Sequence, residues 1–168
     1  MKYLSIDSAV KNNAVVKMEI NDNDEIKIHQ TNIFNFCGNK KVKQCSFESI
    51  IDNLINELDK YDFTDIDMVL IENIPSRLNQ LTKSISIATY AYIKTKKINV
   101  KLISPSKKLS KEENKLKYND RKALSIKKAF DLINKDDKKK IMNEYNKLDD
   151  ITDCICMCHS YHIKSIKE

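Results

Sequence analysis

Tyr3-Leu4-Ser5-Ile6-Asp7 and Met68-Val69-Leu70-Ile71-Glu72 are the two stretches that decide the fold of this chain. The first alternates like a half-buried strand, and the second begins with four apolar residues, which is typical of a strand buried on both faces. Each stretch ends in a carboxylate. A strand disfavours Asp, and a charge at the end of a buried strand is costly without a positive partner. Asp7 and Glu72 are therefore candidates for function.

The segments around these two strands predict an α/β protein. Residues 14–20 and 25–29 alternate as strands, and the turn-forming residues between them predict a hairpin. A hairpin followed by strand–helix–strand crossovers predicts a mixed sheet of five strands with helices on its faces. The other expected elements are a helix capped by Ser46, a helix over 77–97, a strand over 100–103, a helix capped by Asn119 and a last helix from about Asp149.

Length and composition exclude several classes of protein. The 168 residues suit one domain, which we expect to span 1–168. No stretch approaches the ~20 apolar residues of a membrane span, so we expect no membrane partner. With one Gly and two Pro, the chain is neither collagen-like nor a flexible linker. No basic-then-apolar leader opens the chain, which predicts a cytosolic or nuclear protein without a cleaved peptide.

The charge of the chain is concentrated in its second half. Residues 1–84 have a net charge of −3, whereas residues 85–168 have a net charge of +9. Most of that excess lies between Lys94 and Lys128, where 13 Lys and Arg residues face three acidic ones. Such density favours a polyanion, because each neutralised phosphate releases a condensed counterion. The alternative is a solvated lysine surface without a partner.

Two more carboxylates fall where a helix would bring them together. Asp150 and Asp153 lie three residues apart, which places both on one face of the last expected helix. Several converging carboxylates would repel one another, and a divalent cation relieves that repulsion. Carboxylate oxygens suit Mg²⁺ or Mn²⁺. Taken singly, each acid also has a structural interpretation: a turn former at a strand end, or a helix cap at Asp149 or Asp150.

Four motifs, taken together in order, make the chain resemble the RuvC-like Holliday junction resolvases of the RNase H-like fold, in particular those of poxviruses. In that family an Asp opens D-x-G-x-K-N, a Glu ends the fourth strand, Y-x-D-R-K opens a helix and K-L-D-D-x-x-D opens the last helix. Ala9 stands in place of the family's Gly. The matching segments here are Asp7-Ser8-Ala9-Val10-Lys11-Asn12, Leu70-Ile71-Glu72-Asn73-Ile74-Pro75-Ser76-Arg77, Tyr118-Asn119-Asp120-Arg121-Lys122 and Lys147-Leu148-Asp149-Asp150-Ile151-Thr152-Asp153.

The resemblance implies a structure-selective DNA endonuclease that cuts four-way junctions with paired symmetric nicks, in DNA recombination, repair and replication. It implies two Mg²⁺ ions per active site, which Mn²⁺ can replace, and no small-molecule substrate. Asp7, Glu72, Asp150 and Asp153 would be both the catalytic and the metal-binding residues, with Asp149 as the alternative to Asp150. If Asp150 is the ligand, we expect Asp149 to cap the helix.

The resemblance also implies a partner and a location. The enzyme would act on branched DNA as a homodimer, in the host cytoplasm if it is viral. Apolar residues of the helix over 77–97 suit either the dimer contact or ordinary core packing. The expected DNA-binding residues are Lys11, Arg77, Lys107, Lys108, Arg121, Lys122, Lys127 and Lys128.

Two other functions remain open from the sequence. One is another nuclease of the RNase H-like fold, acting on RNA–DNA hybrids or on branched DNA in general, because the fold alone does not separate these substrates. The other is a non-catalytic DNA-binding protein of the same fold. The second is disfavoured because all four carboxylate positions are filled.

The five cysteines form a separate question. Their odd number, in a chain without a signal peptide, predicts no disulfide bonds. Cys154, Cys156 and Cys158, with His159 and His162, invite comparison with a zinc site. However, no C-x-x-C pair occurs, and helical spacing turns Cys156 away from Cys154. We therefore expect these cysteines to pack as small apolar residues inside the last helix.

Overall fold

The computed structural model describes residues 1–75, 79–105 and 112–166. Its centre is one sheet of five strands in the order β3-β2-β1-β4-β5, which confirms the predicted mixed sheet. β1 is antiparallel to β2 and parallel to β4, and β4 is parallel to β5. The strands are β1 (Lys2–Asp7), β2 (Asn13–Ile20), β3 (Ile26–Phe34), β4 (Met68–Glu72) and β5 (Val100–Ile103).

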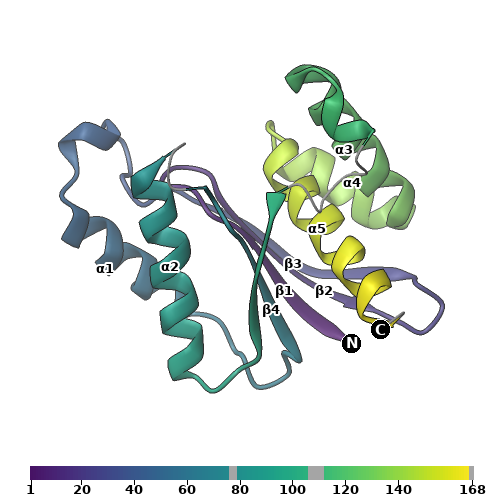
Figure 1. The fold of residues 1–168 in the computed structure, drawn as a ribbon, viewed down its shortest axis with the longest axis horizontal. Coiled ribbons are helices and arrows are strands. Elements are labelled where there is room, and N and C mark those ends of the chain that lie inside the picture. The colour runs from purple at the N-terminus through teal and green to yellow at the C-terminus, as the bar shows by residue number, and fades with distance from the viewer. Residues whose placement is uncertain (76–78, 106–111, 167–168) are drawn as a thin grey trace.

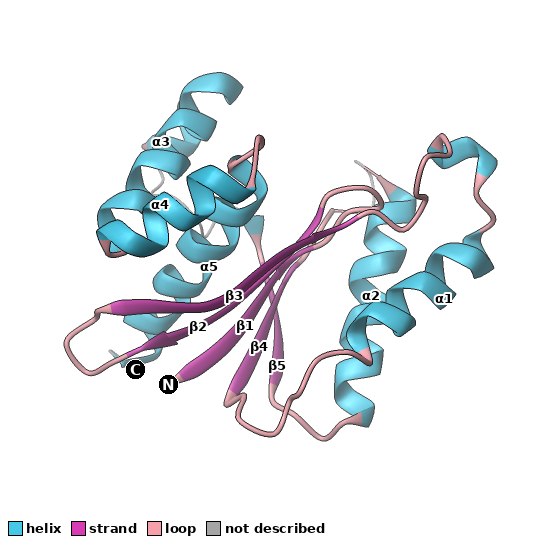
Figure 2. Cartoon of the chain, turned by 180° about the vertical axis from the view of Figure 1, so that it is seen from behind, coloured by secondary structure: helices cyan, strands magenta, loops and turns pink. Residues whose placement is uncertain are grey.

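Helices cover both faces of this sheet. α1 and α2 lie on one face, and α3, α4 and α5 lie on the other (Figures 1 and 2). None of the helices in the described ranges has the length and hydrophobicity of a transmembrane segment. The helices are α1 (Phe47–Leu58), α2 (Gln80–Thr95), α3 (Tyr118–Leu132), α4 (Lys135–Glu144) and α5 (Asp149–Ile166).

Side chains of β1 and β4 alternate between the two faces. Leu4 and Ile6 of β1 pack in a core cluster with α2, on the first face. On the opposite face, the Ser5 hydroxyl donates to the backbone oxygen of Cys154 in α5 at 2.8 Å. Because residues two apart on a strand share a face, Asp7 is directed to the α5 side with Ser5. The same alternation directs Glu72 there, because Leu70 packs in the cluster that contains the buried residues of α5.

The ends of the helices agree with the sequence in part. Ser46 caps α1 as predicted, since its side chain accepts a hydrogen bond from the Ser49 amide at 3.2 Å. The cap predicted at Asn119 is wrong, because α3 begins at Tyr118 and the preceding Lys117 makes no side-chain cap bond. α4 was not predicted, because eight of its ten residues are charged or amide-bearing and only Ile141 is buried.

The cysteines of α5 lie in the core, as predicted. All five cysteines are free, and Cys154, Cys156 and Cys158 are buried. α5 packs between the sheet and α3, so opposite sides of this helix are covered. The Cys154 thiol lies 3.6 Å from the backbone oxygen of Ala14 in β2, and the Cys156 thiol lies 3.5 Å from that of Ser125 in α3. Both sides of α5 therefore take small apolar side chains.

The position where the family has Gly is unstrained here. Among the described residues other than glycine, only Asp24 and Lys97 have positive φ angles, of 62° and 60°. Ala9 therefore does not adopt the left-handed backbone that favours glycine. Its replacement of the family's Gly leaves the connection between β1 and β2 without a conformational penalty.

Candidate active site

The four predicted carboxylates line a single cavity of about 330 Å³. The cavity lies where β1 and β4 end and α5 begins, and α3 forms its other wall. It thus combines side chains from elements far apart in the sequence. Its lining residues are Asp7, Glu72, Pro105, Tyr118, Arg121, Lys122, Ser125, Asp149, Asp150 and Asp153.

Asp7 and Glu72 reach the cavity through the parallel pairing of their strands. Ile6 pairs with Ile71, so the next residue of each strand, Asp7 and Glu72, stands at the same edge of the sheet. Glu72 is only 7% exposed, and the Ser86 hydroxyl of α2 donates to its backbone oxygen at 2.8 Å. The neighbouring strands and the buried hydroxyl of α2 therefore fix where Glu72 enters the cavity.

Asp150 and Asp153 reach the cavity from the first two turns of α5. Their spacing of three residues places both on the side of the helix that faces the strand ends. Acidic side chains also suit this position because a helix N-terminus carries a partial positive charge. Asp153 accepts a hydrogen bond from the Ser125 hydroxyl of α3 at 2.6 Å.

Asp149 does not act as the predicted helix cap. It is the first residue of α5 and its side chain also lines the cavity, where it forms ion pairs with Lys122 and Lys147. Burial acts to raise the pKa of Asp149, but the hydrogen bond from Lys122 and the charges of both lysines outweigh it, and this pKa is lowered. The partner Lys122 lies in α3, and a long-range lysine of this kind is invisible to local capping rules.

Asp150 shares Lys147 with Asp149 but has a different environment. Lys147 donates to Asp150 at 2.5 Å. Burial is the main effect on the Asp150 carboxyl, and with the neighbouring charge of Asp149 it raises this pKa despite the lysine. The two adjacent acids are thus distinct: Asp149 is held ionised by two lysines, whereas Asp150 is the carboxyl whose charge is less well compensated.

The donor set of the cavity fits a hard divalent cation. All four predicted ligands offer carboxylate oxygens, and ammonium groups from Lys122 and Lys147 already stand as positive partners beside two of the cavity's acids. Within the described ranges, no three Asp, Glu, His or Cys side chains are grouped closely enough to hold an ion as they stand.

The predicted DNA-binding residues fall into three groups. Arg121 and Lys122 line the cavity. Lys11 is half-buried in the connection after β1, Lys127 is exposed on α3, and Lys128 of α3 is paired with Glu113 at 2.6 Å. These three side chains are not among the cavity's lining. Arg77, Lys107 and Lys108 lie outside the described residues.

Sequence reasoning missed three residues of the site. Ser125 donates to Asp153, and Lys147 pairs with both Asp149 and Asp150. The third is Tyr118, whose ring centre lies 4.8 Å from the Lys122 ammonium. Lys147 and Tyr118 stand within motifs quoted above, so their positions were a usable signal. Ser125 had no such signal, because its role depends on how α3 packs against α5.

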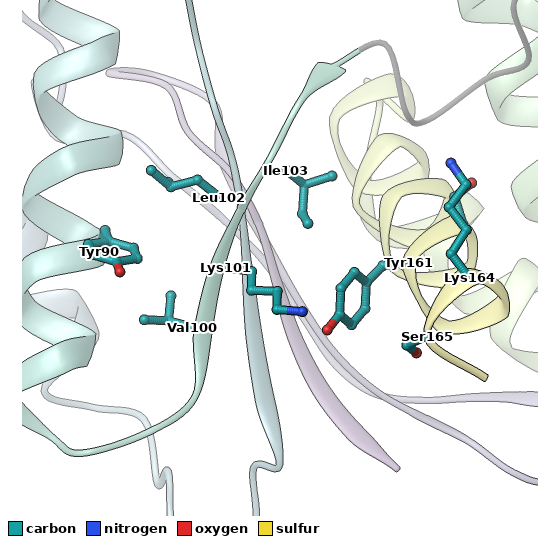
Figure 3. Close-up of a pocket in the computed structure, with 9 residues that line it drawn as sticks. Tyr90, Val100, Lys101, Leu102, Ile103, Tyr161, Lys164 and Ser165 are labelled. Carbon is teal, nitrogen blue, oxygen red and sulfur yellow. The ribbon is translucent and has the colours of Figure 1, made fainter. Parts of the chain in front are cut away.

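A second cavity, of about 400 Å³, lies between β5 and the C-terminal part of α5 (Figure 3). Its lining contains the lysines Lys101 and Lys164, and the Lys101 ammonium lies 5.0 Å from the centre of the Tyr161 ring. None of its lining residues in the described part of the chain is acidic. The convergence of carboxylates is thus a property of the first cavity and not of every hollow beside α5.

Solved structures share this architecture over nearly the whole chain. The crystal structure of the fowlpox virus Holliday junction resolvase is 22% identical, with a TM-score of 0.67, and the match covers 99% of both chains. Thermus thermophilus RuvC is 8% identical, with a TM-score of 0.69, and the match covers 99% of this chain and 96% of that one. The yeast mitochondrial Holliday junction resolvase Ydc2 is 16% identical, with a TM-score of 0.66, covering 95% and 78%.

These similarities confirm the predicted RuvC-like fold. A comparison with curated proteins gave no match. The family model described as "Poxvirus A22 protein" matches residues 1–165, almost the full length. The chain therefore belongs to the poxvirus A22 protein family.

Proposed function

We propose that this protein is a metal-dependent endonuclease that resolves four-way DNA junctions by paired symmetric nicks. The observation that carries the proposal is the convergence of Asp7, Glu72, Asp150 and Asp153 in one cavity. The fold supports it, because proteins of similar structure include the fowlpox virus resolvase in complex with its substrate Holliday junction DNA. Resolution of junctions would serve DNA recombination, repair and replication.

The four carboxylates, Asp7 among them, would hold two Mg²⁺ ions. Bound there, the two ions would activate the attacking water and stabilise the departing 3′ oxygen of the phosphodiester. The chain's own residues set the geometry: the strand ends place Asp7 and Glu72, and the first turns of α5 place Asp150 and Asp153. Asp149, paired with two lysines, keeps those lysines beside the site rather than binding an ion itself.

Cationic residues of α3 would bind the DNA strand. The buried Nε of Arg121 has no hydrogen-bond partner among the described residues, and its side chain lines the cavity. A guanidinium in this position is suited to a phosphate, which accepts paired hydrogen bonds from it. Lys122, and outside the cavity Lys11, Lys127 and Lys128, would add sequence-independent contacts. Arg77, Lys107 and Lys108 complete the proposed set.

Two identical subunits would place two sites across the symmetric junction. α2 offers an outward apolar strip for this contact, because Ile87 is 50% exposed and Ala91 is exposed one turn further along. Ile85 and Ile93 of the same helix are fully buried, so core packing does not account for the outward residues. We further propose that residues 1–168 act as a single nuclease domain, in the host cytoplasm.

A digestion experiment tests the proposal. Purified protein is incubated in Mg²⁺ with a labelled four-way junction, a linear duplex of the same sequence and an RNA–DNA hybrid, each with and without EDTA. We expect paired nicks in the junction alone, and none with EDTA. Cutting of the hybrid would favour a different nuclease of this fold, and junction binding without any cutting would favour a non-catalytic protein.

A further inference from the structure

We propose that Ser125 is a positioning residue for the Asp153 carboxylate, and so sets the affinity of the site for its divalent ions. The inference rests on the proposed function, because it assigns Asp153 as a metal ligand. Ser125 belongs to α3, whereas Asp153 belongs to α5. The proposed contact therefore joins two helices that come together only when the chain folds.

The hydroxyl of Ser125 donates its proton in a hydrogen bond to Asp153. Ser125 is 3% exposed, and its Oγ lies 2.6 Å from Asp153 Oδ1 but 3.7 Å from the Cys156 thiol. A serine hydroxyl has one proton to donate, and the charged, nearer oxygen is the stronger acceptor. The Cys156 thiol has an acceptor of its own in the backbone oxygen of Ser125, at 3.5 Å.

This bond favours one orientation of the Asp153 carboxylate. The terminal torsion of an aspartate is broad and roughly two-fold, so the two oxygens exchange readily in an unrestrained carboxylate. A donor fixed to Oδ1 selects one orientation. A carboxylate has about four lone-pair sites, and the bond from Ser125 uses one of them. Groups that orient metal ligands in this way typically change metal affinity by about 10–100-fold when they are removed.

Other buried hydroxyls near the site make a different kind of contact. Ser5 donates to the backbone oxygen of Cys154, and Ser86 donates to the backbone oxygen of Glu72. These bonds tie elements together without touching a carboxylate. Among the hydrogen bonds described for serine hydroxyls around the cavity, the bond from Ser125 is the one that reaches a ligand side chain directly. Ser5 therefore provides a matched control for the loss of a buried hydroxyl.

The test compares Ser125→Thr with Ser125→Val in the full-length, metal-free protein. Threonine and valine have nearly the same shape, so the pair differs mainly in the hydroxyl. Mn²⁺ binding is measured by electron paramagnetic resonance and by calorimetric titration, without DNA. We expect Ser125→Thr to bind Mn²⁺ nearly as the wild type does, and Ser125→Val to bind it about 10–100-fold more weakly. Ser5→Ala should leave Mn²⁺ affinity unchanged.

Three outcomes would overturn the inference. Equal Mn²⁺ affinities for Ser125→Val and Ser125→Thr would show that the hydroxyl does not position a ligand. An equal loss in Ser5→Ala would show a general effect of loosened packing. If the wild type binds no Mn²⁺, the proposed function and this inference fail together, whereas wild-type binding with identical valine and threonine variants defeats only the role of Ser125.

Discussion

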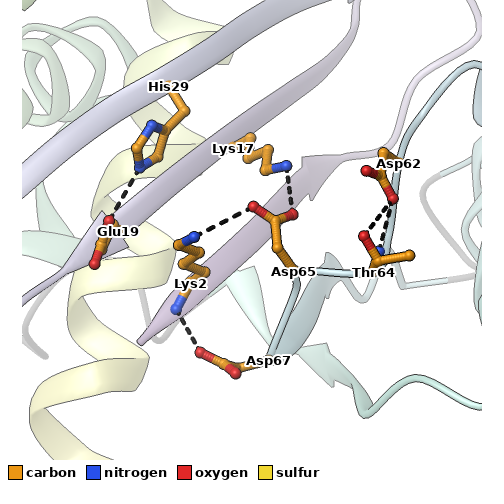
Figure 4. A network of polar contacts seen from close by, with 8 residues as sticks. All are labelled: Lys2, Lys17, Glu19, His29, Asp62, Thr64, Asp65 and Asp67. Atoms are coloured by element: carbon orange, nitrogen blue, oxygen red, sulfur yellow. Dashed lines mark hydrogen bonds and ion pairs between the residues drawn. The ribbon is translucent and has the colours of Figure 1, made fainter.

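Strand β1 has lysines and carboxylates near both of its ends, and the two clusters differ in their surroundings. Near its start, Lys2 and Lys17 bind Asp65 at 3.3 and 2.6 Å, and the backbone amide of Lys2 donates to Asp67 (Figure 4). The Asp65 side chain is 42% exposed. Both solvent and the two lysines therefore stabilise the negative charge of Asp65.

At the other end of β1 the carboxylates share a cavity. The Asp149 side chain is only 11% exposed and depends on Lys122 and Lys147. Asp7 and Glu72 enter the same cavity from the strands. An exposed ion pair contributes little to stability, whereas charges gathered away from water interact strongly. A cluster of acids and lysines therefore indicates function when several elements bring its members into one cavity; its composition alone does not.

The largest expected difference between the two clusters is in cleavage. Asp7→Asn should reduce the rate of junction cleavage about a thousandfold or more, because metal ions contribute several kcal/mol to such reactions and each 1.4 kcal/mol is a factor of ten. Asp65→Asn should cleave at the wild-type rate. Single-turnover cleavage and fluorescence anisotropy of a labelled junction would measure rate and binding. Junction binding should survive in Asp7→Asn, and a wild-type rate in this variant would refute the site.

Removal of one lysine should affect the stability of the cavity cluster more than that of the exposed cluster. Among the residues that the structure describes, Lys122→Met leaves Asp149 with Lys147 as its ion-pair partner, in a largely buried position. We expect a loss of about 1–3 kcal/mol in the free energy of unfolding, between the values typical of exposed and of buried pairs. Urea denaturation would measure it, with Lys17→Met as the matched variant at the exposed end. Equal losses in both variants would remove the distinction between the clusters.

A buried histidine near the start of β1 should make stability depend on pH. His162 is 3% exposed, and its Nδ1 lies 2.8 Å from the Tyr3 hydroxyl. Burial lowers the pKa of His162 despite the charge of Asp24. The folded state therefore holds fewer protons than the unfolded one, so stability is fully present above about pH 6.5 and falls as pH drops below it.

Thermal unfolding between pH 7.5 and 5 would measure this effect of His162. We expect the melting temperature to decrease over that range, and the decrease to be smaller in His162→Gln. His29→Gln, which removes an exposed histidine that pairs with Glu19, serves as the comparison variant. An unchanged pH profile in His162→Gln would contradict the assignment.

The smallest effects should come from the exposed cluster itself. Asp65→Asn should change the urea midpoint less than Lys122→Met does, because exposed pairs contribute little to stability. The change should shrink further as salt concentration rises, since screening already weakens exposed pairs. A destabilisation as large as that of Lys122→Met would mean that exposure does not separate the two clusters.

The sequence predicted the elements that depend on local pattern. The apolar runs of β4 and β5, the strand before Asp7 and the cap at Ser46 follow from alternation and from the chemistry of single residues. β3 is longer than predicted, because its second half pairs with β2 although it includes Gln30, Thr31 and Asn32. α4 was not predicted because its polar sequence has no apolar stripe. Contacts near its end hold it in place, such as the hydrogen bond that the Tyr145 hydroxyl donates to the Thr31 backbone oxygen.

For the site too, the sequence predicted the residues that local patterns reveal and missed those that depend on packing. Motif order identified Asp7, Glu72, Asp150 and Asp153, since their positions at element ends are local features. The assignment of Asp149 as a cap was wrong because α5 begins at Asp149 itself. Its ion pair with Lys122 was not foreseen, since that lysine comes from α3. Ser125 was invisible for the same reason. Pairings between distant helices are a consequence of packing and have no signature in a single sequence.

Helix α5 contributes residues both to the hydrophobic core and to the candidate active site. Its first two turns present the acids, whereas Cys154, Ile155, Met157 and Cys158 along the same helix are wholly or almost wholly buried. Because α5 is a rigid helix, a small tilt at its core residues also moves the acids in its first two turns. Temperature-sensitive mutations should therefore concentrate in this helix. A core substitution that packs slightly less well would reduce activity well below the temperature at which the protein unfolds.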